Sequence, residues 1–198
     1  VVGGGSLAND AALREIDGEW MVQGDPTEAA FLVAEHKLGI TDRRQARFAR
    51  IGEVPFTSER KLMTSLETDT RFQGMIDVIT KGAPDVLLRR CTSIRVGPDV
   101  VPLDEGRRAQ ILADVERLSG QALRTLGVAY RQVPADEDVP TDESIEHEMI
   151  YLGMVGIIDP PRSEAAAAIA EAHRAGVRII MITGDHPITA ARIAADLG

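Results

Sequence analysis

Three side chains whose types suit nucleotide chemistry surround two short segments of alternating character. Phe56 and Lys61 precede an apolar–polar run at 62–67, and Lys81 ends a similar run at 75–81. An aromatic ring can stack on a purine, and ammonium groups act as compact charges toward phosphates. Spacing alone favours a simpler alternative, in which Phe56 is a core residue and both lysines are solvated strand ends.

The two alternating runs predict an antiparallel hairpin, because each has the period of a half-buried strand and a polar turn separates them. If Glu67 lies opposite Ile76, Leu62 lies opposite Lys81. This register would place Lys61 and Lys81 together at the open end of the hairpin, with the aromatic ring just before them.

A helix is predicted to begin after Gly24 by several rules that agree. Asp25 suits the N-cap, Pro26 suits the first helical position, and Glu28 follows three residues after the cap. The helix should end before Gly39. Its expected apolar face consists of Phe31, Leu32 and Leu38. The capping box by itself fully accounts for Glu28.

The start of the chain, an internal acidic segment and the C-terminal part have distinct compositions. Residues 1–18 are Gly-rich and polar, which predicts a lead-in with little order, and the acidic segment 134–148 is interpreted as an exposed, mobile loop. Apolar runs at 151–158 and 177–182 predict buried parallel strands that alternate with helices. Thr183-Gly184-Asp185 would lie at a strand's carboxyl end, where α/β sheets place chemistry, although a plain capped turn is an alternative.

Several motifs in a fixed order resemble the nucleotide-binding domain of type II P-type cation-transporting ATPases. The likeness covers essentially the whole chain. Its motifs are Gly24-Asp25-Pro26-Thr27-Glu28, the stretch Phe56 to Ser65, Lys81-Gly82-Ala83-Pro84, Ala122-Leu123-Arg124-Thr125-Leu126, Asp159-Pro160-Pro161-Arg162 and the segment 181–190.

The resemblance implies a role for each matching residue. Phe56 would stack on adenine, Glu28 would contact the adenine side, and Lys81 of the Lys-Gly-Ala-Pro motif would lie deep in the ATP site. The further implied binding residues are Lys61, Gly82, Arg124 and Leu126. The planar guanidinium of an arginine suits paired hydrogen bonds to phosphate oxygens, whereas without the resemblance Arg124 would be a surface ion-pair partner.

The fold class implied by the resemblance is α/β of the α+β type. We expect an antiparallel sheet flanked by helices in a nucleotide-binding domain, 1–157, followed by a partial parallel haloacid-dehalogenase-like unit of the phosphorylation domain, 158–198. In the parent, Thr183, Gly184 and Asp185 would support the phosphoryl site. The family's phosphorylated Asp-Lys-Thr-Gly-Thr motif and its Gly-Asp-Gly-x-Asn-Asp motif are both missing from this sequence. We therefore expect binding of ATP with Mg²⁺ but no aspartyl-phosphate, no catalytic residue and no protein metal ligand within the chain.

Composition limits the other classes of function. The 198 residues carry a net charge of -9, which argues against nucleic acid as a partner, and one cysteine, which excludes an internal disulfide framework. No apolar run reaches the roughly 18 residues that span a bilayer. We interpret the chain as a cytoplasmic fragment of an integral membrane pump whose partners are its own phosphorylation, actuator and transmembrane domains. The sequence leaves the cation and its direction open. A haloacid-dehalogenase-like phosphatase and a non-catalytic nucleotide sensor remain alternatives.

Overall fold

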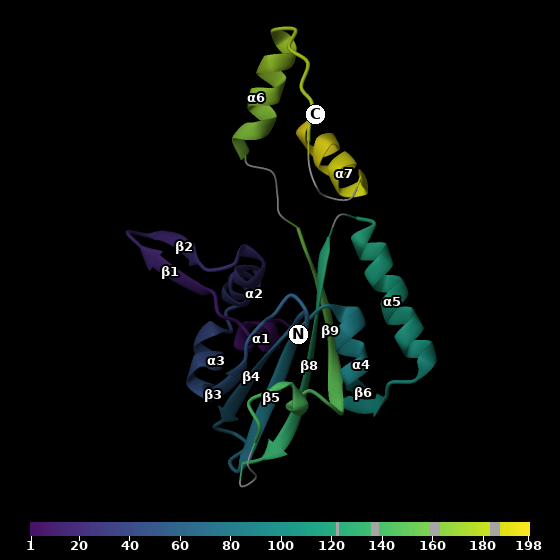
Figure 1. Cartoon of the computed structure of the whole chain (residues 1–198). Coiled ribbons are helices and arrows are strands. Elements are labelled where there is room, and N and C mark those ends of the chain that lie inside the picture. Colours follow the sequence, from purple (N-terminus) through teal and green to yellow (C-terminus); the bar gives the residue numbers. More distant parts are fainter. Residues whose placement is uncertain (122, 136–138, 159–162, 183–186) are drawn as a thin grey trace. The chain divides into compact units, whose positions relative to one another are not determined.

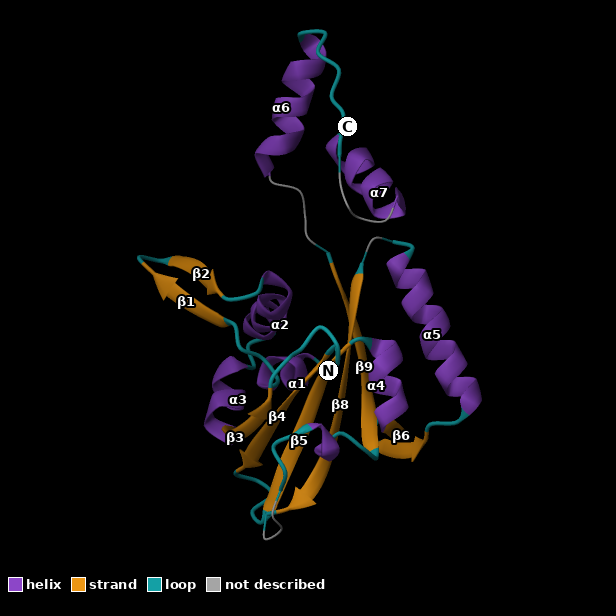
Figure 2. Cartoon of the chain, viewed as in Figure 1, coloured by secondary structure: helices purple, strands orange, loops and turns teal. Residues whose placement is uncertain are grey.

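The computed structural model describes residues 1–121, 123–135, 139–158, 163–182 and 187–198. Helices and strands both occur along this chain, several of them in consecutive pairs of the same type (Figures 1 and 2). In chain order the elements are α1 Val2–Leu7, β1 Ala12–Ile16, β2 Glu19–Gln23, α2 Pro26–Lys37, α3 Thr41–Arg47, β3 Phe48–Val54, β4 Leu62–Asp69, β5 Met75–Gly82, α4 Pro84–Arg90, β6 Cys91–Val96, β7 Asp99–Pro102, α5 Glu105–Ser119, β8 Arg124–Pro134, the 3₁₀ turn η1 Glu143–Ile145, β9 Met149–Ile157, α6 Ser163–Arg174 and α7 Pro187–Leu197.

The chain divides into two compact units, 1–112 with 126–155 and 113–125 with 156–198. The first unit holds a seven-stranded sheet in the order β3-β4-β5-β8-β9-β6-β7 and a separate hairpin of β1 and β2. The β3–β4, β4–β5, β5–β8 and β6–β7 pairs are antiparallel, whereas β6 and β9 run parallel. A mixed α/β fold with a helix-flanked sheet is therefore confirmed. The strand predicted at 151–158 forms as β9, but its parallel partner is β6 of this sheet rather than residues 177–182.

The N-terminal segment is ordered, so the expectation of a loose lead-in at 1–18 is wrong. Helix α1 buries Gly5, Ser6 and Leu7, and it packs against α2 and β5. A side chain at position 5 would collide with the ring of Phe31 in α2, because a Cβ there would lie 2.1 Å from that ring. The Gly-rich composition thus serves close helix packing, a use of glycine that composition alone does not distinguish from disorder.

Helix α2 begins as predicted. The side chain of Asp25 accepts hydrogen bonds from the backbone N–H groups of Thr27 and Glu28, which confirms the N-cap. Phe31 and Leu32 are buried as expected, but Leu38 is exposed. Leu38 is the C-cap residue, just past the last helical turn, so it lies outside the helix face that packs on α1.

Strands β4 and β5 are covered on both faces, so the prediction of half-buried strands is wrong. Ile79 and Val128 face α1, where a Cβ on Gly4 would approach both. The opposite face belongs to the main core with α4 and α5. That core consists of Val54, Leu62, Leu66, Ile76, Val78, Leu87, Leu88, Cys91, Leu103, Ile111, Ala129, Val133, Ile145, Met149 and Tyr151. Polar side chains of both strands are buried as a result, and they need hydrogen-bonding partners inside the fold.

The β4–β5 register differs from the predicted one by a single residue. Glu67 lies opposite Asp77, and Leu62 lies opposite Gly82, each partner being one position further along the chain than expected. Alternation specifies register strongly only where one face is buried and the other is solvated. Because both faces are buried here, the alternating pattern could not identify which residue of β4 lies opposite Lys81.

Two expectations about the later chain are also corrected. The acidic segment 134–148 is not exposed throughout: η1 lies within it, and Ile145 and Glu146 are buried. In the second unit α6 and α7 form as predicted, but residues 177–182 adopt no strand in the described chain, and most of their side chains are exposed. A strand needs a neighbouring strand to pair with, and none of the described strands pairs with this segment.

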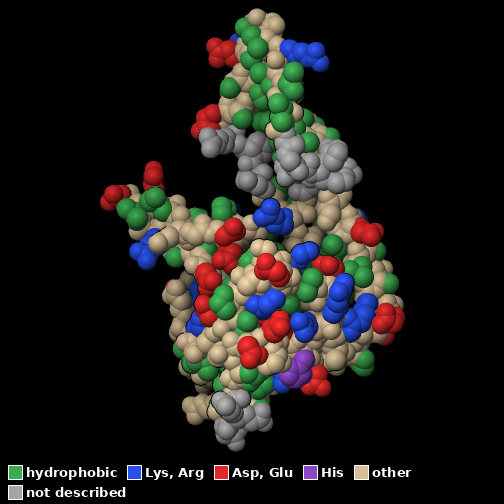
Figure 3. Space-filling view, in the orientation of Figure 1, with side chains coloured by type: hydrophobic (Ala, Val, Ile, Leu, Met, Phe, Trp, Pro, Cys, Tyr) green, Lys and Arg blue, Asp and Glu red, His purple; other side chains and the backbone are tan. Residues whose placement is uncertain are grey.

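Charged side chains of both signs are interspersed over the visible face of the sheet unit, without a continuous patch of either sign (Figure 3). No helix in the described part of the chain is long and apolar enough to cross a membrane.

Candidate functional site

An ion pair between α2 and β5 forms the centre of the candidate site. The Lys81 ammonium donates to Glu28 Oε1 over 2.7 Å, although the two residues are 53 positions apart in the sequence. Lys81 is only 4% exposed, while the side chain of Glu28 retains 19% exposure. Two residues predicted to bind nucleotide therefore lie together, one deeply buried and the other reaching toward the surface.

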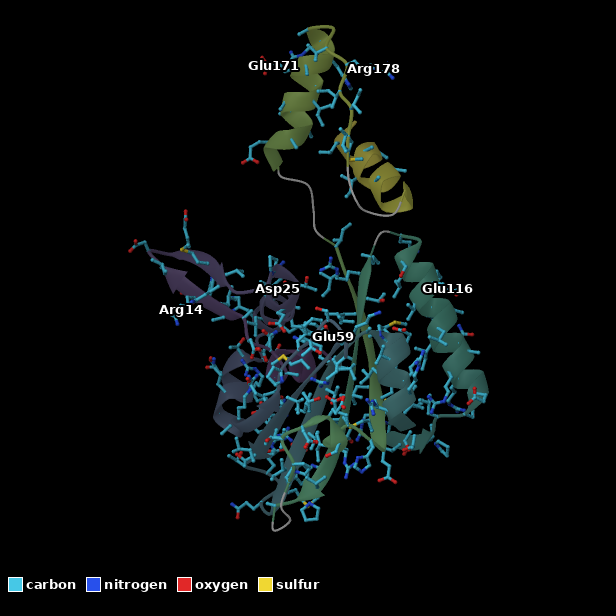
Figure 4. All side chains as sticks on the ribbon, in the orientation of Figure 1. Arg14, Asp25, Glu59, Glu116, Glu171 and Arg178 are labelled. Carbon is cyan, nitrogen blue, oxygen red and sulfur yellow. The ribbon has the colours of Figure 1, made fainter. Side chains whose placement is uncertain are left out.

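The start of α2 fixes the position of the Glu28 carboxylate. Asp25 caps the helix one turn before Glu28, at the place labelled in Figure 4. The side-chain amide of Asn9 donates to the Glu28 carbonyl over 2.8 Å, and the backbone N–H of Asp10 donates to Glu28 Oε2 over 3.2 Å. The carboxylate is thus held on one oxygen by the backbone and leaves the other for Lys81.

The surroundings of Lys81 weaken its hold on a proton. Burial lowers the pKa of the Lys81 ammonium, and the hydrogen bond and charge of Glu28 oppose that shift. The ring of Phe31 adds a cation–π contact at 5.5 Å from the ammonium nitrogen. Lys81 is therefore a pre-positioned cation whose charged state depends on its acidic neighbour.

The backbone around Gly82 has no room for a side chain. A Cβ at position 82 would lie 2.1 Å from the carbonyl oxygen of Lys61 and 2.8 Å from Leu62 Cδ2. Ala83 N–H donates to that same Lys61 carbonyl over 3.0 Å. Lys61 itself has a positive φ of 56°, which is rare for a residue with a side chain. Glycine at 82 thus allows the backbone of Lys61 to come against the end of β5.

Phe56 lies in the loop that joins β3 to β4 and is 57% exposed, which excludes the core role considered for it. Lys61 ends the same loop and is also exposed. Figure 4 marks this loop by Glu59. An open aromatic ring and an open ammonium group on one loop are available to a ligand, as the chemistry of an adenine nucleotide requires.

Leu126 and Arg124 both belong to β8. Gly127 pairs with Gly82, and Val128 pairs with Lys81, so Leu126 lies on the Lys81 face of the sheet by alternation. Leu126 is half-buried. Arg124 is exposed at the start of the strand and falls in the second unit, so its phosphate contact stays a prediction. Thr183, Gly184 and Asp185 lie outside the described residues.

Sequence reasoning missed three features of the site. Phe31 was assigned only to packing, although its spacing of three from Glu28 puts both on one side of α2. Asn9 and the backbone of Asp10 were dismissed with the lead-in. Arg60, between Phe56 and Lys61, was not considered, although it forms a buried ion pair described below.

Comparison with known proteins gives a consistent result. Residues 2–164 match the family described as "P-type ATPase, cytoplasmic domain N". The chain is 42% identical to a "Calcium-transporting ATPase" of Bacillus subtilis over 194 residues, 98% of this chain and 22% of that protein. It is 37% identical to a "Cation-transporting ATPase pma1" of Synechocystis over 197 residues (98% and 21%). A "Sodium/potassium exporting P-type ATPase cta3" of Schizosaccharomyces pombe is 39% identical over 200 residues (98% and 18%). The chain spans about a fifth of the length of these relatives.

Proposed function

Because this chain belongs to the family of P-type ATPase cytoplasmic N domains, we propose that it binds ATP at the site around Lys81. The observation that supports the proposal best is the Glu28–Lys81 ion pair. It joins two residues from distant motifs at the end of β5, beside the loop with the exposed Phe56 ring. In this proposal the chain binds and orients the nucleotide for other parts of a longer protein.

Each residue has a distinct part in the proposed complex. Phe56 stacks on the adenine ring, and Glu28 lies on the adenine side. Lys81 and Lys61 provide positive charge toward the phosphates, and Gly82 keeps these two lysines at neighbouring positions. Leu126 contributes an apolar wall. For Arg124, which belongs to the second unit, the family resemblance alone implies a role in binding phosphate through its guanidinium fork.

Magnesium enters the proposal as a companion of the nucleotide's phosphates. No group of three His, Cys, Asp or Glu side chains in the described part of the chain is placed to hold a metal ion. We therefore assign Mg²⁺ no ligand among the described residues. The phosphorylated Asp motif of the family is missing from the sequence, so we expect binding without hydrolysis.

For the parent protein we propose an integral membrane pump that couples ATP hydrolysis, through an aspartyl-phosphate, to cation transport. The present chain would be its cytoplasmic nucleotide-binding part at 1–157, with the start of a phosphorylation domain at 158–198. The transported ion is left open, because the names of similar relatives specify calcium, cations in general, or sodium and potassium.

Nucleotide titration tests the proposal. ATP, AMP and adenosine are titrated by calorimetry into the unsubstituted 198-residue chain, called the parent chain below, and into its Phe56→Ala variant. Phosphate release is measured in parallel. Loss of a stacking ring costs about 1–3 kcal/mol, so Phe56→Ala should weaken all three ligands about 5- to 150-fold. Lys81→Ala should weaken ATP more than adenosine, by a factor that shrinks as salt rises.

Phe72→Ala is the matched control, because Phe72 is similarly exposed at 51% and lies beyond the opposite end of β4. It should bind every ligand as the parent chain does. Equal affinity of Phe56→Ala and the parent chain for ATP would refute the site. Steady phosphate release by the pure chain would instead support the phosphatase alternative.

A further inference from the structure

The loop with Phe56 and Lys61 has no strand or helix of its own, so other contacts must hold its shape. Within the loop, Lys61 N–H donates to the Thr57 carbonyl over 2.8 Å, and Arg60 N–H donates to Thr57 Oγ1 over 3.2 Å. These local bonds close a turn, but they do not attach the turn to the rest of the sheet unit. Ala83 N–H holds the last residue of the loop through the Lys61 carbonyl, and the side chain of Arg60 attaches the rest of the turn.

Arg60 uses its guanidinium fork to join two parts of the fold. One terminal nitrogen, Nη1, donates to the Pro55 carbonyl over 2.6 Å, at the beginning of the loop. The other, Nη2, donates a charge-assisted hydrogen bond to Glu146 Oε1. Glu143 adds a carboxylate oxygen 3.9 Å from Arg60 Nε. A single side chain thus ties the loop to the segment just before β9.

Glu146 is completely buried, which makes its contacts costly to lose. Its Oε1 also accepts from Thr64 Oγ1 over 2.6 Å, and Thr64 Oγ1 lies 2.8 Å from Thr80 Oγ1. Thr64 and Thr80 are directly paired residues of β4 and β5, and Thr80 immediately precedes Lys81. The carboxylate therefore connects the loop to the strand that bears Lys81, from the opposite face of the sheet.

We infer that Arg60 and Glu146 are positioning residues for nucleotide, which hold the Phe56 ring and Lys61 in fixed places relative to Lys81. The inference deepens the proposed function and rests on it. Neither side chain contacts the ligand; Arg60 acts through the loop, and Glu146 acts through Arg60. A planar fork that binds a carbonyl and a carboxylate together is specific to arginine, so lysine should replace it only in part.

The test compares variants of the 198-residue chain by titration of AMP and ATP. Arg60→Gln should weaken both nucleotides about tenfold, equivalent to about 1.4 kcal/mol, because a loosened loop impairs stacking of the shared base. Arg60→Lys should fall between this variant and the parent chain. The double variant Arg60→Gln/Glu146→Gln should bind no more weakly than Arg60→Gln alone, because each change breaks the same ion pair between Arg60 and Glu146.

Hydrogen exchange provides a second readout that needs no nucleotide. In Arg60→Gln the amides of 57–61 should exchange faster, while those of the paired residues in β5 and β8 keep their protection. Arg108→Gln is the matched control. Its guanidinium also bridges buried backbone carbonyls, of Leu88 and Cys91, but far along the chain from the loop. This control should lose stability without a change in loop exchange or in AMP affinity.

The outcomes separate the two proposals. If Phe56→Ala loses affinity but Arg60→Gln binds AMP like the parent chain, the positioning role is overturned and the nucleotide site stands. Equal loss of affinity in Arg60→Gln and Arg108→Gln also overturns it, because the effect would then follow global stability. If the parent chain binds no nucleotide, the proposed function fails, and exchange at 57–61 still decides whether Arg60 orders the loop.

Discussion

The Glu28–Lys81 ion pair leads to an asymmetric prediction about stability. Its nitrogen–oxygen distance is 2.7 Å, and Lys81 is almost fully buried while Glu28 keeps access to solvent. Removal of one partner leaves the other charge unpaired. The resulting loss in the free energy of unfolding depends on how well water can reach that unpaired charge. Removal of the carboxylate should therefore cost more than removal of the ammonium.

The magnitudes follow from these exposures. Glu28→Gln leaves a positive charge buried and should lower the free energy of unfolding by about 2–3 kcal/mol. Lys81→Met leaves a carboxylate that can hydrate and should cost about 1–2 kcal/mol. The double variant should cost less than the two losses added together, because the partners share one interaction.

Urea unfolding at pH 7 measures the three variants. Burial already lowers the pKa of Lys81, and Glu28→Gln removes the charge that opposes this shift. In Glu28→Gln the folded state should therefore release the Lys81 proton at lower pH than the unfolded chain does. The difference in the free energy of unfolding between Glu28→Gln and the unsubstituted chain should therefore shrink as pH rises from 7 toward about 10.

Glu53→Gln is the matched control, since Glu53 pairs with Arg50 at 2.9 Å but is exposed. It should change stability by no more than about 0.5 kcal/mol. Equal losses from Glu28→Gln and Lys81→Met, or a deficit that does not change with pH, would show that burial of Lys81 does not control the energetics of this pair.

Three further predictions concern neighbouring positions. Gly82→Ala should destabilise the chain by about 1–3 kcal/mol in urea unfolding, because its Cβ would collide with the Lys61 backbone; a loss below 0.5 kcal/mol would contradict that packing. Burial raises the pKa of Asp77, so the unsubstituted chain loses stability as this carboxyl ionises. In unfolding measured from pH 3 to 7, Asp77→Asn should be more stable than the unsubstituted chain above about pH 4 and equally stable below it. A gain in stability that does not depend on pH would exclude this cause. Burial raises the pKa of the Cys91 thiol to about 12, so iodoacetamide should label Cys91 at pH 8 only in urea, and rapid labelling of the folded chain would be unexpected.

Local signals predicted the elements that depend on a few neighbouring residues. The start of α2 followed from Asp25 and Pro26, because capping and a fixed φ act within one turn of helix. The strands β4 and β5 and their antiparallel pairing followed from alternation and one turn. The prediction that Glu28, Phe56 and Lys81 share one site came from their resemblance to known motifs rather than from spacing.

Only the tertiary structure decided which polar side chains are buried and which groups they contact. The register of β4 on β5 was missed by one residue, because helices on both faces remove the solvated side that normally fixes it. The same double cover explains why residues 5–9 of the lead-in are buried and why Glu146 in the acidic segment is fully buried.

The sequence by itself therefore determined the helix caps, the hairpin and the motifs, all of which depend on residues close together in the chain. The partners of Lys81 and Arg60 lie 53 and 86 positions away, in α2 and beside η1. Such pairs form only when the whole sheet brings their segments together, and burial then makes each charge dependent on its partner. For that reason the positions of these charges, and the order they give to the loop with Phe56, were decided by the tertiary structure.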